Sequence, residues 1–308
     1  MAILSPFEAL GWWAGWTHRD LDATSKEVSL AESNVPEADH FVVYLTAIGG
    51  ISSEDISRRE HHFLQLLREH LPSVVIIDDV FPYSVSNNPL NGERALGWFW
   101  QRIHNSRMKQ HAGSILSIVI FVRNLFQVAV SADPRYGPIN NVGVANEVAK
   151  SLATHGYRNG SGKPITVMGW SGGGQIAVGI VPFLHQSLGA PIYVASIGGV
   201  LTDDVSIEDV EHLYHLQGSK DQFPRIGDIL YPGRWRLLSY SAWNRAKREG
   251  KITQIEPGPM VHTGRGDYFD RHNTLPSDQT YVERTADIIA GIIADPIKSA
   301  SDPFEATL

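Results

Sequence analysis

Residues 169–173, Gly-Trp-Ser-Gly-Gly, have the types and spacing of a nucleophile elbow. An apolar, strand-like run precedes them and a helix-like run follows, so Ser171 is expected on a tight turn between a strand and a helix. Such a turn brings the flanking backbones together, which requires small residues two positions before and after the serine. Gly169 and Gly173 meet that need. The N–H of Gly172, at the start of the expected helix, is placed to donate to an oxyanion.

A nucleophile elbow requires an acidic residue and then a histidine later in the chain. Asp221 closes the sequence Gly-Ser-Lys-Asp directly after a predicted strand over 210–216. Open parallel sheets place their sites at the carboxyl ends of the strands, so Asp221 is the preferred acid. Asp203 and Asp204, which follow the preceding predicted strand, are the alternatives.

Among thirteen histidines, His262 is the preferred general base, because it follows the predicted strand over 251–256 in a glycine-rich loop. His272 is the alternative. His212 and His215 lie three positions apart in one predicted strand, so their side chains point to opposite faces and do not form a ligand pair. Three further histidines are interpreted as surface residues of a charged helix: His61, His62 and His70.

A second oxyanion donor is expected from the loop that follows the first predicted strand. Residues 46–50, Thr-Ala-Ile-Gly-Gly, end that strand in the appropriate place. We expect the backbone N–H of Ile48 to act together with that of Gly172. Loss of one such donor typically costs about 2.7–4 kcal/mol of transition-state stabilisation.

Apolar strands alternate with amphipathic helices from His40 onward. This alternation predicts an α/β fold with a mostly parallel central sheet and helices on both faces. The predicted strands span 41–46, 73–80, 165–168, 192–197, 210–216 and 251–256. The predicted helices span 53–70, a segment around 98–103, 142–155, 173–186, 239–248 and 278–294, the last of them capped by Ser277.

The most apolar window, residues 114–131, has the length of a membrane span but contains Arg123 near its middle. An arginine at that depth costs about 2.5–3.5 kcal/mol on insertion, so a buried core segment is expected instead. The N-terminus lacks a basic region and therefore predicts no signal peptide. Trp12, Trp13 and Trp16 are a weak anchor for peripheral membrane contact. A cytoplasmic protein is expected.

The chain has 308 residues, of which 33 are acidic and 26 basic, and its net charge of −7 argues against a nucleic-acid groove. It contains no cysteine, which excludes disulfides, thiolate metal sites and cysteine nucleophiles. No metal-ligand spacing occurs. We expect an N-terminal arm over 1–39, one domain over 40–294 and a tail over 295–308. Within the domain, residues 84–138 are an aromatic insertion expected to cover the site.

Taken together, the elbow at Ser171, the Gly-Ser-Lys-Asp sequence ending at Asp221 and His262 resemble the α/β-hydrolase superfamily. The order of elements matches from about residue 40 to 294, whereas motif identity is confined to these three places. The resemblance implies that Ser171 is the nucleophile, His262 the base and Asp221 the residue that orients the base. Two features depart from the family. Thr46-Ala47 stands where many members have His-Gly, and the segment after the predicted strand over 192–197, where the lid usually lies, is short.

The resemblance implies a serine esterase or lipase-like hydrolase that cleaves a carboxylic ester or thioester and uses no metal or organic cofactor. The expected partner is a small acyl substrate, and the oligomeric state stays open. A peptidase or amidase of the same fold is one alternative. A ligand-binding protein without catalysis is another, although such proteins usually lack part of the triad.

Overall fold

The computed structural model describes residues 38–49, 56–83 and 115–295. Six parallel strands form one sheet in the order β2-β1-β3-β4-β5-β6. The strands are β1 (His40–Leu45), β2 (Val74–Ile77), β3 (Ile165–Trp170), β4 (Ile192–Ile197), β5 (His212–Leu216) and β6 (Ile252–Ile255). The predicted α/β class with a parallel sheet is therefore confirmed.

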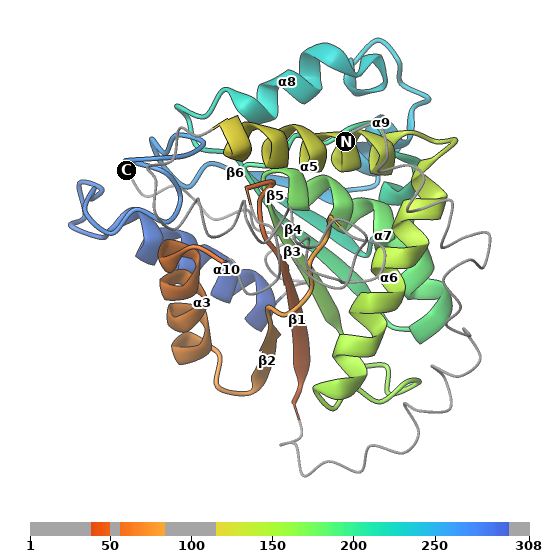
Figure 1. The fold of residues 1–308 in the computed structure, drawn as a ribbon, viewed down its shortest axis with the longest axis horizontal. Helices are drawn as coiled ribbons and strands as arrows, with labels where there is room; N and C mark the ends of the chain where they lie inside the picture. Colours follow the sequence, from red (N-terminus) through yellow and green to blue (C-terminus); the bar gives the residue numbers. More distant parts are fainter. Residues whose placement is uncertain (1–37, 50–55, 84–114, 296–308) are drawn as a thin grey trace.

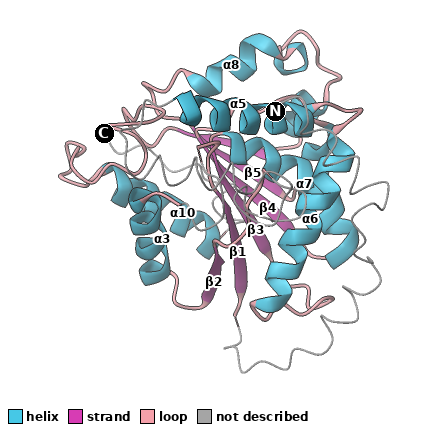
Figure 2. Ribbon diagram, viewed as in Figure 1, coloured by secondary structure: helices cyan, strands magenta, loops and turns pink. Residues whose placement is uncertain are grey.

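Helices cover both faces of the sheet, as Figures 1 and 2 show. One face carries α3 (Arg58–His70) and α10 (Tyr281–Ala294), and the other carries α6 (Gly137–Thr154), α7 (Gly172–Leu188) and α9 (Ala242–Arg248). Two further helices, α5 (Ile115–Ala132) and α8 (Phe223–Leu230), lie at the end of the sheet where the strands finish (Figure 1). Short 3₁₀ turns span Val205–Asp209 and Pro232–Arg234.

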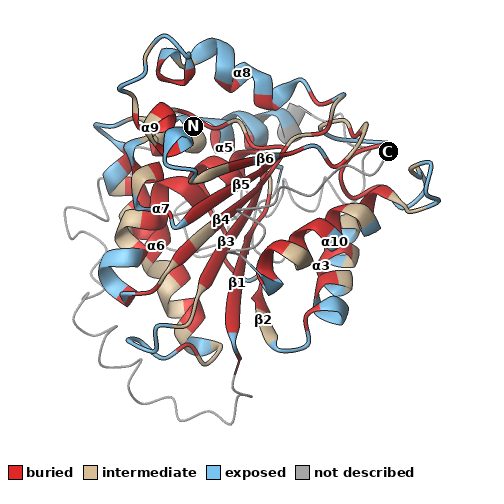
Figure 3. Ribbon diagram, turned by 180° about the vertical axis from the view of Figure 1, so that it is seen from behind, coloured by how far each residue is buried: buried red, intermediate tan, exposed pale blue. Residues whose placement is uncertain are grey.

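Side chains of each strand alternate between two hydrophobic cores, one on either face. In β1, Val43 and Leu45 pack into the core shared with α6 and α7, whereas Val42 and Tyr44 pack into the core shared with α3 and α10. The strands are buried along most of their length (Figure 3). A fully covered sheet explains why its strands read as continuous apolar runs.

The last helix begins later than the sequence predicted. Its N-cap is Thr280, which forms a capping box with Glu283, and not Ser277. Asp278 adopts a positive φ of 61°, which is incompatible with a helix continuing through it. The pattern Thr-x-x-Glu at 280–283 is the local sequence signal for this start.

The apolar window over 114–131 forms α5, and its prediction as a wholly buried segment is wrong in part. Arg123 and Asn124 are buried, whereas five large apolar side chains on the opposite side are exposed: Ile118, Phe121, Val122, Leu125 and Phe126. Among the described residues, no helix is both long and apolar enough to cross a membrane.

The start of α6 and the presence of α8 also differ from the sequence predictions. The helix predicted from residue 142 begins at Gly137, because Pro138 fits the first turn of a helix, where its missing N–H is not needed. Helix α8 was not predicted, because Pro224 and Gly227 read as loop residues. Most of three predicted segments lies outside the described residues: residues 1–37 of the arm over 1–39, residues 84–114 of the insertion over 84–138, and residues 296–308 of the tail over 295–308.

Candidate active site

Ser171 lies on the turn between β3 and α7 with a φ of 54° and a ψ of −120°. Apart from Asp278, it is the sole non-glycine residue with positive φ in the described part of the chain. Its backbone N–H donates to the carbonyl of Ile197 in β4 at 2.9 Å, which holds the turn against the neighbouring strand. A strained residue held by its surroundings is common at functional sites.

The glycines around Ser171 are required by backbone contacts. A Cβ on Gly169 would lie 2.3 Å from the carbonyl carbon and oxygen of Gly173. A Cβ on Gly173 would lie 2.4 Å from the carbonyl oxygen of Leu45 in β1. Neither contact can be relieved by rotating a side chain, so the turn accepts only glycine at both positions.

The structure brings Ser171, His262 and Asp221 into one hydrogen-bonded chain at the carboxyl end of the sheet. His262 Nε2 lies 2.9 Å from Ser171 Oγ, and His262 Nδ1 lies 3.0 Å from Asp221 Oδ2. Asp221 follows β5, and His262 lies in the loop after β6. The Phe223 ring stacks on the His262 ring at a centroid distance of 4.2 Å and an interplanar angle of 18°.

The Asp221 carboxylate is fully buried and accepts three hydrogen bonds. Oδ1 accepts from the backbone N–H of Phe223 at 2.9 Å, whereas Oδ2 accepts from His262 and from the Tyr268 hydroxyl, the latter at 2.8 Å. The same hydroxyl accepts from the N–H of Gly218 at 2.8 Å. Burial and the charge of Asp221 both raise the pKa of Tyr268 well above its usual range, so its hydroxyl remains a donor.

The alternative acids and base make other contacts. Asp204 caps the 3₁₀ turn by accepting from Ser206 N–H at 2.9 Å, and burial raises its pKa. Asp203 packs against Gly233. The backbone N–H of His272 donates to Asp270. Within the described residues, none of the three is hydrogen-bonded to Ser171 or His262.

His212 and His215 lie on opposite faces of β5, as predicted. His212 Nε2 lies 2.8 Å from the Thr253 hydroxyl, and His215 Nδ1 lies 3.3 Å from the Ser196 hydroxyl. In the described part of the chain, no cluster of three histidine or acidic side chains could hold a metal ion.

The loop after β1, from which the second oxyanion donor was predicted, contacts the elbow. A Cβ on Gly172 would lie 2.6 Å from Ile48 Cγ2, so the two residues are in direct contact. Two buried side chains hold the loop by its carbonyls: Asn124 Nδ2 donates to Ile48 at 2.8 Å, and the Tyr83 hydroxyl donates to Thr46 at 2.7 Å. The loop backbone is thereby fixed beside Ser171.

A buried carboxylate supports the same loop from the other face of the sheet. Glu60 Oε1 accepts from the hydroxyls of Thr46 at 2.6 Å and Tyr44 at 2.8 Å. Its other oxygen accepts from the N–H of Ser57 at 3.1 Å, completing the capping box of α3. The start of α3 and the loop after β1 are therefore coupled through one side chain.

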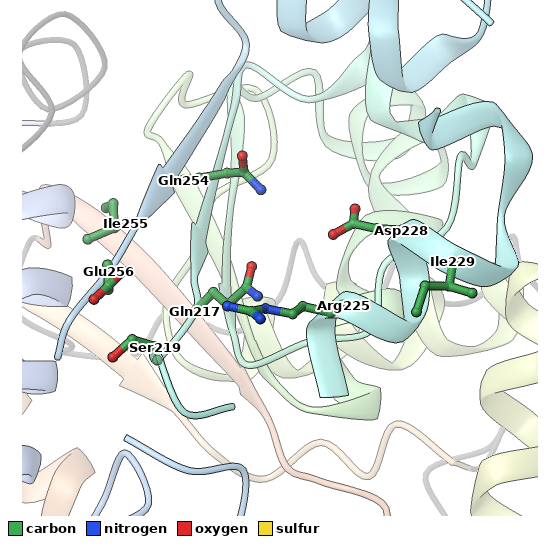
Figure 4. Close-up of a pocket in the computed structure, with 9 residues that line it drawn as sticks. Gln217, Ser219, Arg225, Asp228, Ile229, Gln254, Ile255 and Glu256 are labelled. Carbon is green, nitrogen blue, oxygen red and sulfur yellow. The ribbon is translucent and has the colours of Figure 1, made fainter. Parts of the chain in front are cut away.

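A cavity of about 550 Å³ lies between α8 and the ends of β5 and β6. In Figure 4, Arg225 and Asp228 of α8 face Gln217 and Gln254 of the sheet across it. Neither Ser171 nor His262 lines this cavity, so it is distinct from the space in front of the candidate nucleophile.

The sequence matches no known family model and no curated protein.

Proposed function

We propose that the protein is a serine hydrolase that cleaves a carboxylic ester or thioester through an acyl-enzyme on Ser171. The single observation that carries the proposal is the continuous chain from Ser171 Oγ through both nitrogens of His262 to Asp221 Oδ2, with distances of 2.9 and 3.0 Å. A serine hydroxyl is a weak nucleophile unless an adjacent base removes its proton. The arrangement supplies that base and fixes its orientation.

The reaction proceeds in two acyl-transfer steps. His262 takes the Ser171 proton as the oxygen attacks the acyl carbon, and then gives that proton to the departing alcohol or thiol. A water molecule, deprotonated by the same imidazole, attacks the acyl-enzyme. The acyl–oxygen bond to Ser171 breaks, the proton on His262 returns to Ser171 Oγ, and the carboxylic acid is released. Asp221 accepts a hydrogen bond from Nδ1, which keeps Nε2 facing Ser171 and stabilises the imidazolium that forms.

The tetrahedral intermediate carries an oxyanion that needs donors. We assign this role to the backbone N–H groups of Gly172 and Ile48. Support comes from the contact between these two residues and from the start of α7 at Gly172, since a helix N-terminus favours negative charge.

The same evidence favours an α/β-hydrolase type of fold. The parallel strand order, the elbow after β3, the acid after β5 and the histidine after β6 all agree with that superfamily. The loop after β1 differs from the common pattern, because it contains Thr46 and Ala47 in place of His-Gly. The hydroxyl of Thr46 bonds Glu60 instead, which gives this loop a support of its own.

The proposal is tested by hydrolysis of p-nitrophenyl esters of increasing acyl length, assayed beside thioesters and aminoacyl amides. Wild type is expected to hydrolyse esters or thioesters faster than amides, and Ser171→Ala is expected to be inactive. Ser187→Ala is the matched control, since that exposed serine lies at the far end of α7 and is expected to leave the rate unchanged.

The outcomes separate the alternatives. Faster cleavage of amides indicates a peptidase or amidase. Absence of turnover on every class, with the fold intact, contradicts the hydrolase proposal and favours a ligand-binding role.

A further inference from the structure

The segment from α8 to the start of α9 exposes many large apolar side chains. Leu237 is 89% exposed, Tyr240 71% and Ile229 70%. The others are Phe223, Ile226, Leu230 and Trp235. Single exposed apolar residues are ordinary, but a cluster within one short segment marks an interaction surface. We call the segment 223–240 the α8 face.

The apolar residues of α8 form one stripe. At 100° per residue, Phe223, Ile226, Ile229 and Leu230 fall on one side of the helix, whereas Pro224 and Gly227 fall on the buried side. Ile229, at the edge of this stripe, is exposed and also borders the cavity under α8. Figure 3 shows the exposed side of α8 turned away from the sheet. The helix is therefore amphipathic, but its apolar stripe points outward.

The α8 face and the helix α9 that follows it are basic in an acidic protein. Residues 223–249 contain six arginines and lysines and two acidic residues, whereas the whole chain has a net charge of −7. Arg234 pairs with Asp228, and Arg245 pairs with Glu208. Of the other four, Arg225 faces the cavity under α8. Within the described residues the remaining three form no ion pair: Arg236, Lys247 and Arg248. Arg248 donates to the carbonyl of Ser239, which places its charge beside Tyr240.

We propose that the α8 face binds the surface of an anionic lipid bilayer. An outward apolar stripe, interfacial aromatic rings such as Trp235 and Tyr240, and flanking cations are the three features that peripheral membrane binding combines. A second copy of the chain fits less well, because a two-fold contact would place these cations against each other. Anionic lipid headgroups offer a counter-charge to Arg236, Lys247 and Arg248, whereas a neutral bilayer offers none.

The α8 face adjoins the candidate active site. Phe223, its first residue, stacks on His262, and α8 lies at the end of the sheet where the strands finish (Figure 1). A bilayer bound here would lie next to Ser171. The binding itself does not depend on catalysis, so it is tested separately from the proposed function.

The test is flotation of the full chain, as Ser171→Ala, with vesicles of phosphatidylcholine alone or with about 30% phosphatidylserine. We expect binding only to the anionic vesicles, with a loss of about tenfold or more when salt rises from about 0.1 M to about 0.5 M. Ile229→Ser combined with Leu237→Ser is expected to weaken binding by at least about tenfold. Arg236→Glu is expected to weaken it by about tenfold.

Arg158→Glu is the matched charge control, because Arg158 is exposed at the opposite end of the sheet, before β3, and this variant is expected to bind like the parent. Circular dichroism checks that each variant is folded. Absence of binding, equal binding to neutral vesicles, or unchanged binding of the Ile229/Leu237 variant overturns the proposal. So does a dimer in sedimentation that the same variant dissociates, which would identify the α8 face as a contact between copies.

Discussion

Tyr268 Oη donates a hydrogen bond to Oδ2 of Asp221, the same oxygen that accepts from His262 Nδ1. The hydroxyl is itself held by the N–H of Gly218, so the carboxylate is fixed by a side chain that is in turn fixed by the backbone. Asp221 cannot rotate without breaking three bonds in a buried environment. We therefore regard Tyr268 as a positioning residue for the candidate triad.

Tyr268→Phe removes that hydroxyl while keeping the ring. A hydrogen bond to a charged group is worth about 1.5–3 kcal/mol, which corresponds to about a tenfold to hundredfold loss in kcat. We expect KM to change little, because the hydroxyl acts on Asp221 and not on substrate. Steady-state kinetics with an ester substrate measure both constants.

Tyr157→Phe is the control for this change. Tyr157 is also buried and donates from its hydroxyl to a backbone carbonyl, that of Lys163, but it lies before β3 at the opposite end of the sheet. It should alter stability without altering kcat. Equal effects of the two variants on kcat would refute the positioning role.

Asp221→Asn keeps the side-chain shape but cannot hold His262 in the required tautomer. We expect kcat to fall by about three to four orders of magnitude. Asp203→Asn, in the alternative acid that lies against Gly233, is expected to retain near-normal turnover. The reverse ranking of the two variants would reassign the acid.

Asn124→Ala removes the amide that holds the carbonyl of Ile48. Complete loss of an oxyanion donor costs about 10²–10³ in kcat, and a displaced donor should cost less. We expect a loss of about tenfold to a hundredfold, measured as kcat for an ester. Asn159→Ala, at an exposed asparagine far from the site, serves as the control. An unchanged kcat in Asn124→Ala would argue against the loop after β1 as the source of the second donor.

Gly173→Ala places a Cβ against the carbonyl of Leu45, where only backbone movement can relieve the clash. We expect the free energy of unfolding to fall by about 3 kcal/mol or more. Gly189→Ala has open space around its Cβ and carries only the cost of its φ of 60°, about 1–2 kcal/mol. Urea denaturation compares the two variants, and similar losses would count against a tight elbow.

His215 makes folding stability depend on pH. Burial, followed by the charge of Arg234, lowers the pKa of His215 to about 3, against about 6.5 in the unfolded chain. Between these values the unfolded chain binds a proton that the native state does not. The contribution of neutral His215 to the free energy of unfolding is therefore complete above pH 6.5 and falls with the pH. At pH 5 it is smaller by about 2 kcal/mol.

His215→Asn keeps a polar partner near Ser196 but cannot titrate. Its loss of unfolding free energy between pH 7 and pH 5 should be smaller than in wild type by about that amount. Identical losses in urea titrations of the two proteins would mean that His215 is protonated in the native state.

The sequence was sufficient to predict which residues at the ends of strands lie close together. Ser171, Asp221 and His262 each follow a recognisable apolar run, so their convergence could be expected from the parallel order alone. Tyr268 and Asn124 could not be found in this way. Each acts through one long-range contact, Tyr268 on Asp221 and Asn124 on Ile48, and neither belongs to a local motif.

Helix α8 and the exposed side of α5 could not be predicted from the sequence for a related physical reason. Pro224 and Gly227 lower the intrinsic helix preference of α8, but Pro224 lies in the first turn, where its missing N–H is not needed. Gly227 packs closely against the carbonyl of Leu201 and the side chain of Arg234. The outer side of α5 has the composition of a core and is nevertheless exposed. An apolar composition favours burial of a segment, but tertiary contacts determine which of its side chains are buried.

The most direct test of the central claim is labelling with a fluorophosphonate, which reacts covalently with an activated serine. We expect one label per chain, located by mass spectrometry on the peptide that contains Ser171, at a rate strongly reduced in Asp221→Asn and absent in Ser171→Ala. A folded wild-type protein that does not label, or a Ser171→Ala variant that labels equally, would show that Ser171 is not the nucleophile of a serine hydrolase.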